Sequence, residues 1–226
     1  IDSQILVGEN LQVDRTFSLN SPPISPVDVS ISVADPNIAL VSLDGDQIGT
    51  PSLVVEDVAN AWSRVLWIQG LAEGTTTITL TAPGYVEKQA EVIIADSGFY
   101  LSAFSRNTTV DSNPTSVSVQ TATIWENRSV QFWQPLRAGL TVEVPVTSVF
   151  PSIGQVTQSP VVFSGGGSSS VETAFDPQGV GTTWVTVVQP PGFSTPPEQS
   201  SGIDFVVRQP DLDHKNAAVG IDIQIQ

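Results

Sequence analysis

The residues best placed for chemistry lie near the C-terminus, where Asp211 and Asp213 precede the single histidine, His214. Carboxylate oxygens are the hard ligands that Ca²⁺ prefers, so the two acids are candidates for a calcium site at a joint between domains. No calcium-loop spacing surrounds them, and a solvated acidic linker is the alternative. To act as a general base, His214 would need a nucleophile within reach, and no nucleophile motif lies near it. The sequence therefore predicts no catalysis, and no cofactor other than this calcium candidate.

Aromatic and amide side chains suggest a second kind of site, for sugars. Trp62 lies beside a predicted loop and is the candidate for stacking on a glycan, with a place in the core or at a domain junction as the alternative. Trp67 and Trp184 fall inside predicted strands and are expected in or near the core. Asn107 and Asn127 each open an Asn-x-Ser/Thr triplet, the acceptor pattern for N-glycosylation. Such triplets also arise by chance where Ser and Thr are frequent, so unmodified asparagines are the alternative.

The composition excludes several classes of protein. The 226 residues contain no cysteine, which rules out disulfides, cysteine-bound zinc, iron–sulfur clusters and thiol nucleophiles. The 23 acidic and 8 basic residues give a formal net charge of −15, which argues against nucleic acid or an anionic membrane surface as a partner. No apolar run approaches the roughly 20 residues of a spanning helix, so membrane insertion is not expected.

Alternation of apolar and polar residues predicts many short strands. In 27–33 every odd position is Val or Ile and every even position is Asp or Ser, which is the period of a half-buried strand. Other predicted strands are 11–19, 64–68, 75–82, 90–95, 117–124, 129–133, 140–146, 171–175, 182–188 and 203–208. The stretch 54–71 also fits an amphipathic helix, although its second half is predicted as a strand. The run Gly165–Ser170 is expected to form a flexible hairpin loop.

Three internal matches indicate two copies of one domain. Gly74–Tyr85 and Gly181–Phe193 share Gly-Thr-Thr-x-(Ile/Val)-Thr followed by Pro, Gly and an aromatic residue. The strand at 27–33 precedes Pro36-Asn37-Ile38, and the strand at 140–146 precedes Pro151-Ser152-Ile153. The third match pairs Glu9-Asn10 with Glu126-Asn127. Self-similarity at a fixed spacing is typical of repeat proteins.

The chain ends also resemble each other. Ile1-Asp-Ser-Gln-Ile5 and Ile221-Asp-Ile-Gln-Ile225 agree at four of five positions, at an offset of 220. Ile221, Ile223 and Ile225 would share one face of a strand. This strand is predicted either to begin the next unit of a covalent array or to complete the sheet of a neighbouring copy. Two unrelated edge strands of similar pattern are the alternative.

Two stretches resemble a known family. Val33–Val41 resembles the Ser-Asp-Pro-x-Val-Ala-x-Val stretch of bacterial Ig-like (Big-type) domains, and Gly70–Ala82 resembles their Gly-x-Ala-x-Gly-Thr-x-x-Ile-Thr-x-Thr-Ala stretch. The resemblance is weaker over 98–210, because Phe150–Ile153 lacks the Asp-Pro. The family occurs in invasin- and intimin-like adhesins and other large surface proteins. The resemblance implies an extracellular location and structural or adhesive work, and it carries no catalytic residues.

The predicted architecture is all-β, with two tandem immunoglobulin-like β-sandwich domains. The first covers 1–97 and the second 98–210, with 98–116 as the junction and 211–226 as a linker followed by the next strand. Phe99–Phe104 is too apolar for a free linker. We expect it to continue the last strand of the first domain and to pack in the junction.

The predicted function is a structural repeat unit in the stalk or filament of an extracellular surface protein, of the adhesin-shaft type. Its expected partners are further copies of the same repeat. Two alternatives stay open. One is a module that binds a carbohydrate or a host receptor, and the other is an accessory Ig-like region of a secreted hydrolase.

Overall fold

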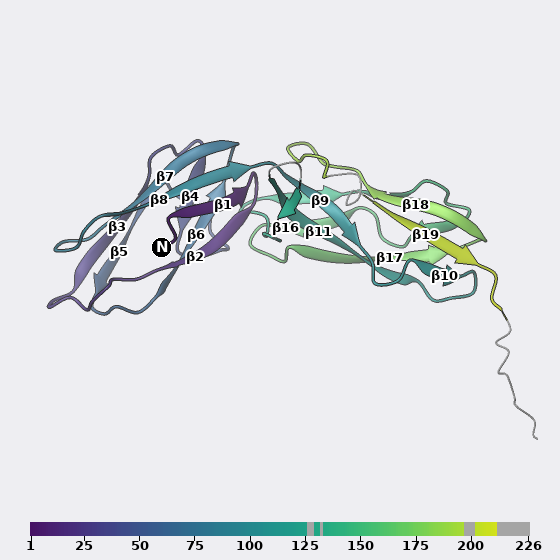
Figure 1. Ribbon diagram of the computed structural model, residues 1–226, viewed down its shortest axis with the longest axis horizontal. Coiled ribbons are helices and arrows are strands. Elements are labelled where there is room, and N and C mark those ends of the chain that lie inside the picture. Colours follow the sequence, from purple (N-terminus) through teal and green to yellow (C-terminus); the bar gives the residue numbers. More distant parts are fainter. Residues whose placement is uncertain (126–128, 132, 197–201, 212–226) are drawn as a thin grey trace, which may run out of the picture.

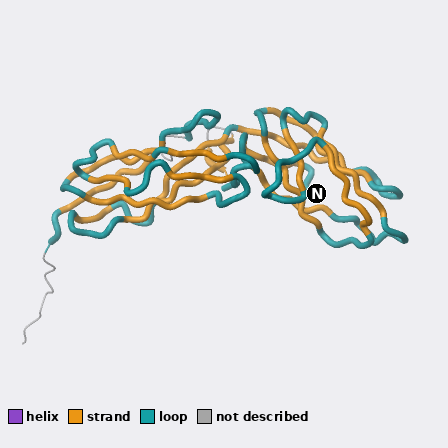
Figure 2. The backbone as a smooth tube through the Cα atoms, turned by 180° about the vertical axis from the view of Figure 1, so that it is seen from behind, coloured by secondary structure: helices purple, strands orange, loops and turns teal. Residues whose placement is uncertain are grey.

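The computed structural model describes residues 1–125, 129–131, 133–196 and 202–211, and these residues form nineteen strands and no helix. The strands make two β-sandwiches that lie end to end, so the molecule is an elongated, slightly bent rod (Figures 1 and 2). We call the sandwich of β1–β8 sandwich 1 and that of β9–β19 sandwich 2. The predicted all-β fold of two tandem immunoglobulin-like sandwiches is confirmed.

Sandwich 1 consists of a five-stranded and a three-stranded sheet. The first has the order β1 (Gln4–Gly8), β8 (Lys88–Ala95), β7 (Gly74–Thr81), β3 (Val27–Val33) and β5 (Ser52–Val58). The second has the order β2 (Gln12–Phe17), β6 (Arg64–Gly70) and β4 (Ala39–Ser42). The alternation along β3 buries Val29, Ile31 and Val33 between the sheets and leaves its serines exposed.

Sandwich 2 repeats this strand order. One sheet contains β10 (Asn107–Thr109), β19 (Gly202–Arg208), β18 (Gly181–Val187) and β14 (Val146–Ser148). The other contains β12 (Ser129–Gln131), β11 (Thr115–Trp125), β17 (Ser170–Pro177) and β15 (Gly154–Val156), with β9 (Ser97–Ser102) paired to β11. A two-stranded sheet joins β13 (Thr141–Val144) to β16 (Val161–Ser164).

The strand pairings define which elements of the two sandwiches correspond. In sandwich 1 the first strand, β1, lies parallel to the last, β8. In sandwich 2 the corresponding parallel pair is β10 and β19, because β9 precedes β10 and pairs with β11. β7 corresponds to β18, as the Gly-Thr-Thr match predicts, and β2 corresponds to β11. The Glu-Asn match is wrong, because Glu9-Asn10 follows β1 whereas Glu126-Asn127 follows the counterpart of β2.

Two predicted elements need correction. The predicted strand 140–146 is divided into β13 and β14 at Pro145, which has no N–H to donate to a sheet. The helix alternative for 54–71 is wrong, since the stretch contains the end of β5, a loop and β6. The alternation of β6 decides this, because it buries Leu66 and Ile68 in the core.

The buried apolar side chains form two clusters. The first contains residues between Ile5 and Ile94. The second contains residues between Phe99 and Val207, together with Leu11 from sandwich 1. In the second cluster the rings of Phe175 and Phe205 stack with their centroids 4.2 Å apart. The position of Leu11 shows that the two cores approach each other at the junction.

Candidate functional site: the junction between the sandwiches

A turn of sandwich 1 inserts into sandwich 2. Leu11, in the turn between β1 and β2, is fully buried and forms an isolated antiparallel bridge with Leu136. The Gln12 amide donates to Pro135 O at 2.9 Å, and the Arg137 amide donates to Asn10 O at 3.0 Å. The turn is therefore held by backbone pairing on both sides of a buried leucine.

Gln134 fixes the end of β1 against sandwich 2. Its side chain is 3% exposed. Its Oε1 accepts from the Gly8 amide at 2.8 Å and from Thr123 Oγ1 at 3.0 Å, while its Nε2 donates to Leu6 O at 2.9 Å. One side chain thus satisfies two backbone groups of the other sandwich in a place that is closed to solvent.

Gln12 and Gln69 form a second buried polar contact. Both side chains are fully buried. Gln12 Oε1 accepts from Gln69 Nε2 and from the Ala138 amide, each at 3.1 Å, and Gln12 Nε2 donates to Gly45 O at 2.8 Å. Gln69 also reaches the loop between β4 and β5, where its Oε1 accepts from the Gly49 amide at 2.8 Å. The loop, the turn and sandwich 2 are therefore tied to one another.

The two backbones approach closely at Gly166. This residue has φ +77°, in the left-handed region that favours glycine. A Cβ at this position would lie 2.2 Å from Asp46 Oδ1 and 2.9 Å from Gly45 O, both in sandwich 1. The Gly166 amide donates to Leu136 O at 2.9 Å. The predicted flexible loop Gly165–Ser170 is thus corrected in its first half, which is packed into the junction.

β9 enters sandwich 2 directly after β8. Only Asp96 separates the two strands, and residues 97–102 of β9 pair with residues 118–123 of β11. The expectation that this segment packs in the junction is correct, but it joins a sheet of sandwich 2 instead of extending β8. Phe99 is fully buried, with ring centroids 5.0 Å from Phe163 and 4.7 Å from Phe193.

A single side chain also holds the backbone of β9. Gln189 Oε1 accepts from the Phe99 amide at 2.9 Å, and Gln189 Nε2 donates to Phe99 O at 2.6 Å. This is the pattern that a neighbouring strand would make. Gln189 therefore satisfies the free backbone groups of Phe99 at the edge of β9, near the point where the chain enters sandwich 2.

Acidic side chains gather beside the same entry. The pKa of Glu73 is raised, mainly by a hydrogen bond with Asp96. The charge of Asp96, burial and the charge of Glu9 raise this pKa further, in that order. Burial and then the charge of Asp96 raise the pKa of Glu9. Ser194 Oγ donates to Asp96 Oδ1 at 2.7 Å. The Ser194 hydroxyl thus partly counters the charge of Asp96, whereas burial and the neighbouring acids disfavour the charged forms of Glu9 and Glu73.

The residues predicted as metal or assembly sites lie at the C-terminal end. Asp211 is exposed and follows the last strand, while Asp213, His214, Ile221, Ile223 and Ile225 lie outside the described residues. In the part of the chain that the structure describes, no three His, Asp or Glu side chains form a group suited to a metal ion. No helix in that part could cross a membrane.

The predicted sugar-related residues are dispersed. Trp62 lies in the loop between β5 and β6 and is 76% exposed. Trp67 and Trp184 are half-buried, against Gly45 and Gly202 respectively. Asn107 begins β10 and is exposed, whereas Asn127 lies outside the described residues.

The junction glutamines were not predicted from the sequence. Gln12 lies at an apolar-facing position of β2, and such a polar residue in an otherwise alternating strand is a signal of a buried polar contact. Gln134 follows no such pattern, because it lies in a connecting segment.

Comparisons with known proteins give structural likeness only. No family model matches the chain, and no curated protein matches it. A structure described as the D0-D1 domain of intimin has 10% identity and a TM-score of 0.33, covering 90% of this chain and 94% of its own. Domains 5-6 of the S-layer protein SbsC have 16% identity and a TM-score of 0.32, covering 92% and 94%.

A third structure, the Yersinia pseudotuberculosis adhesin InvE, has 13% identity and a TM-score of 0.32, covering 91% of this chain and 56% of its own. Intimin is among the proteins whose domains the sequence motifs resemble. Similarity at this level does not carry function from one protein to another, and the sandwich assignment rests on the strand pairing described above.

Proposed function

We propose that this chain is a structural unit of an extracellular surface protein, acting as a stiff two-sandwich segment of a stalk or filament. The observation that carries the proposal is the buried junction, in which Gln12 and Gln134 satisfy backbone groups across the boundary without access to water, while Gln69 holds Gln12 from within sandwich 1. Buried hydrogen bonds of this kind have directional geometry, so they oppose bending as well as separation.

Domain boundaries at 97 and 210 belong to the same proposal. The two hydrophobic clusters support a division between Ile94 and Phe99, with Leu11 as the residue that crosses it. An interface with a buried leucine and buried polar pairs differs from the hydrated contact typical of domains that move independently.

The proposal is tested by measuring how rigid the junction is. The chain has no cysteine, so Ser32→Cys and Thr147→Cys would place two spin labels specifically on exposed strand positions of the two sandwiches. We expect one narrow distance distribution and a single calorimetric unfolding transition. A broad distribution together with two independent transitions would contradict a stiff shaft.

A second candidate function is glycan binding at Trp62. The residue is 76% exposed on a loop, and such exposure is needed for stacking on a sugar face. Binding on a glycan array that is lost in Trp62→Ala but kept in Trp133→Ala, the other strongly exposed tryptophan, would favour this function.

A further inference from the structure

Among the strands that the structure describes, sandwich 1 has no counterpart of β9. β11 is eleven residues long and pairs over residues 118–123 with β9, whereas its counterpart β2 is six residues long and pairs with β6 alone among the described strands. In sandwich 2 the extra strand, β9, begins at the end where the chain enters the sandwich. The corresponding end of sandwich 1 is the one remote from the junction.

The register of the sheets locates the missing strand. Ala39 pairs with Gly70 and Gly154 pairs with Pro177, at matching positions after the repeated proline. Gly70 and Pro177 are therefore counterparts, and so are Ile68 and Phe175, which lie two residues earlier in β6 and β17. Ile68 pairs with Val13 and Phe175 pairs with Thr115, so Val13 is the counterpart of Thr115. Residues 118–123, which pair with β9, therefore correspond to residues 16–21 of sandwich 1.

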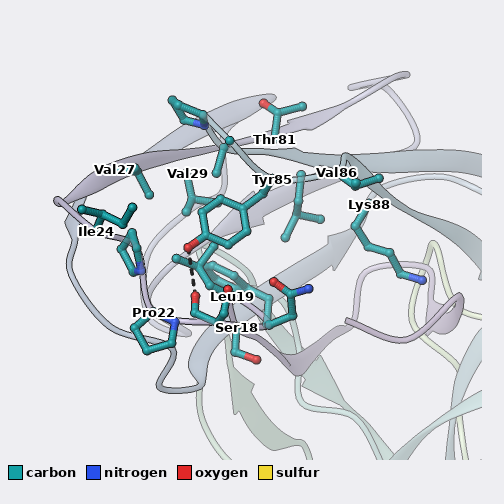
Figure 3. Close-up of a pocket in the computed structure, with 18 of the residues that line it drawn as sticks. Ser18, Leu19, Pro22, Ile24, Val27, Val29, Thr81, Tyr85, Val86 and Lys88 are labelled. Carbon is teal, nitrogen blue, oxygen red and sulfur yellow. Dashed lines mark hydrogen bonds between the residues drawn. The ribbon is translucent and has the colours of Figure 1, made fainter.

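A hollow of about 900 Å³ lies beside these residues (Figure 3). Phe17 to Ser25 form one wall, and Leu80 to Val86 form the opposite wall. Tyr85 bridges the walls through a hydrogen bond from its hydroxyl to Ser21 O at 2.9 Å. Tyr85 is the sequence counterpart of Phe193, whose ring contacts Phe99 of β9 in sandwich 2. The hollow thus lies where a counterpart of Phe99 would pack.

Apolar surface surrounds the hollow. Ile24 and Val86 at its rim are almost fully exposed. Lys88 is the charged residue of the lining, although the whole protein carries a net charge of −15. The described residues that line the hollow include no acidic side chain, so an apolar strand that carries a carboxylate would not be repelled there.

The C-terminal segment has the pattern that such a strand needs. From 217 to 225 every odd position is apolar, in the order Ala, Val, Ile, Ile and Ile. Asp222 is the charged residue of 216–225. Fifteen residues follow Asp211, which in extended form reach up to about 50 Å, far more than a six-residue strand requires.

We propose that residues 216–225 of a second copy fill the hollow as a strand beside residues 16–21, in the place that β9 takes beside β11. This inference rests on the proposed structural function and names the partner surface of one subunit. β19 leads the chain out of the end of sandwich 2 that is remote from the junction (Figure 1). The hollow lies at the remote end of sandwich 1, because Val27 and Lys88 at the starts of β3 and β8 line it and the end of β8 adjoins β9. The contact is head-to-tail, so it propagates into a linear fibre instead of closing as a dimer.

Cross-linking tests the position of the strand. Ser18→Cys lies on residues 16–21 and is exposed, and Ser30→Cys is a matched control on the exposed face of β3. Each is mixed with full-length Ala218→Cys protein and treated with a short bismaleimide. We expect the mixed dimer from Ser18→Cys at several times the yield from Ser30→Cys. Equal yields, or no mixed dimer at high protein concentration, would overturn the proposal.

Variants in the donor segment test its apolar face. We expect V219D/I221D to weaken concentration-dependent association at least tenfold in sedimentation velocity, without changing the thermal unfolding of the sandwiches. A218D/G220D adds the same charge to the other face of the strand and should associate more strongly than V219D/I221D. Equal loss in both variants would contradict strand insertion.

The outcome is separable from that of the proposed function. If residues that precede Ile1 in a longer chain fill the hollow instead, the protein stays monomeric, and this proposal fails. The spin-label distances across the junction are measured within one chain, so they would still report a stiff or a flexible unit.

Discussion

Gln134 serves two backbone groups of the neighbouring sandwich with one side chain. In Gln134→Leu the Gly8 amide and Leu6 O would lose their partner in a buried place. An unsatisfied buried group costs about 1–3 kcal/mol, so we expect the free energy of unfolding to fall by about that amount or more. Urea denaturation measures the change. Gln178→Leu, at an exposed position of sandwich 2, should alter it by less than about 0.5 kcal/mol.

Glu73 gives the junction a dependence on pH. Its pKa is raised in the folded protein, so the folded state binds its proton more tightly than the unfolded state does. This contribution favours folding below the unfolded-state pKa of about 4.3 and is lost as the pH rises through the raised folded-state pKa.

We therefore expect Glu73→Gln to be more stable than the parent at pH 7, by under about 1 kcal/mol because the site is exposed, and to lose this advantage near pH 4. Glu143→Gln, which removes the same charge from an exposed position of β13, is the control. Thermal unfolding at both pH values measures the difference. An equal gain in both variants at pH 7 would indicate an effect of net charge alone.

Sequence patterns predicted residue environments unevenly. Val29, Ile31 and Val33 were predictable because burial on one face of a strand repeats every second residue. Gln12, Gln69 and Gln134 were not, because all partners of these side chains except Thr123 come from segments more than thirty residues away or from irregular backbone, which a local pattern does not encode.

At the scale of elements, β9 decides how the sandwiches are joined. Phe99 is fully buried against Phe163 and Phe193. Truncating a buried phenylalanine costs about 3–5 kcal/mol, so we expect Phe99→Ala to destabilise sandwich 2 by that amount. Phe104→Ala is the matched control, because Phe104 lies five residues later and is fully exposed. Chemical denaturation followed by tryptophan fluorescence checks both; similar losses would contradict the packing of β9.

The strand elements followed from the sequence more completely than their connections. Periodicity predicted β3 with its bounds, and the repeated Gly-Thr-Thr motif predicted that β7 and β18 correspond. The short strands β4, β15 and β16 were not predicted, because three or four residues hold too little alternation. The pairing of β9 with β11 depends on tertiary packing, so its apolar sequence indicated burial but not the partner.

At the scale of the whole molecule, the junction should couple the unfolding of the two sandwiches. In Gly166→Ala the new Cβ would meet Asp46 and Gly45 of sandwich 1. We expect a loss of about 1–3 kcal/mol and a separation of the single calorimetric transition into two. Gly84→Ala is a close control, since Gly84 also has a positive φ, +82°, but a Cβ there would meet nothing within 4 Å.

The two glycine variants therefore separate backbone strain from interface contact. Both introduce Cβ strain at a left-handed residue, whereas only Gly166→Ala pushes the sandwiches apart. If Gly84→Ala caused the same loss and the same splitting, the junction would not be the coupling element.

The parallel pairs β1–β8 and β10–β19 determine how each sandwich would bear tension. Gln4–Gly8 lies alongside Glu91–Ala95, and both strands run toward the junction. A pull on the two chain ends would slide these strands past each other lengthwise, so that all their hydrogen bonds are loaded together instead of opening one after another. β10 and β19 repeat the arrangement in sandwich 2. Stretching this chain along its axis should therefore require a high force at each sandwich before either one extends.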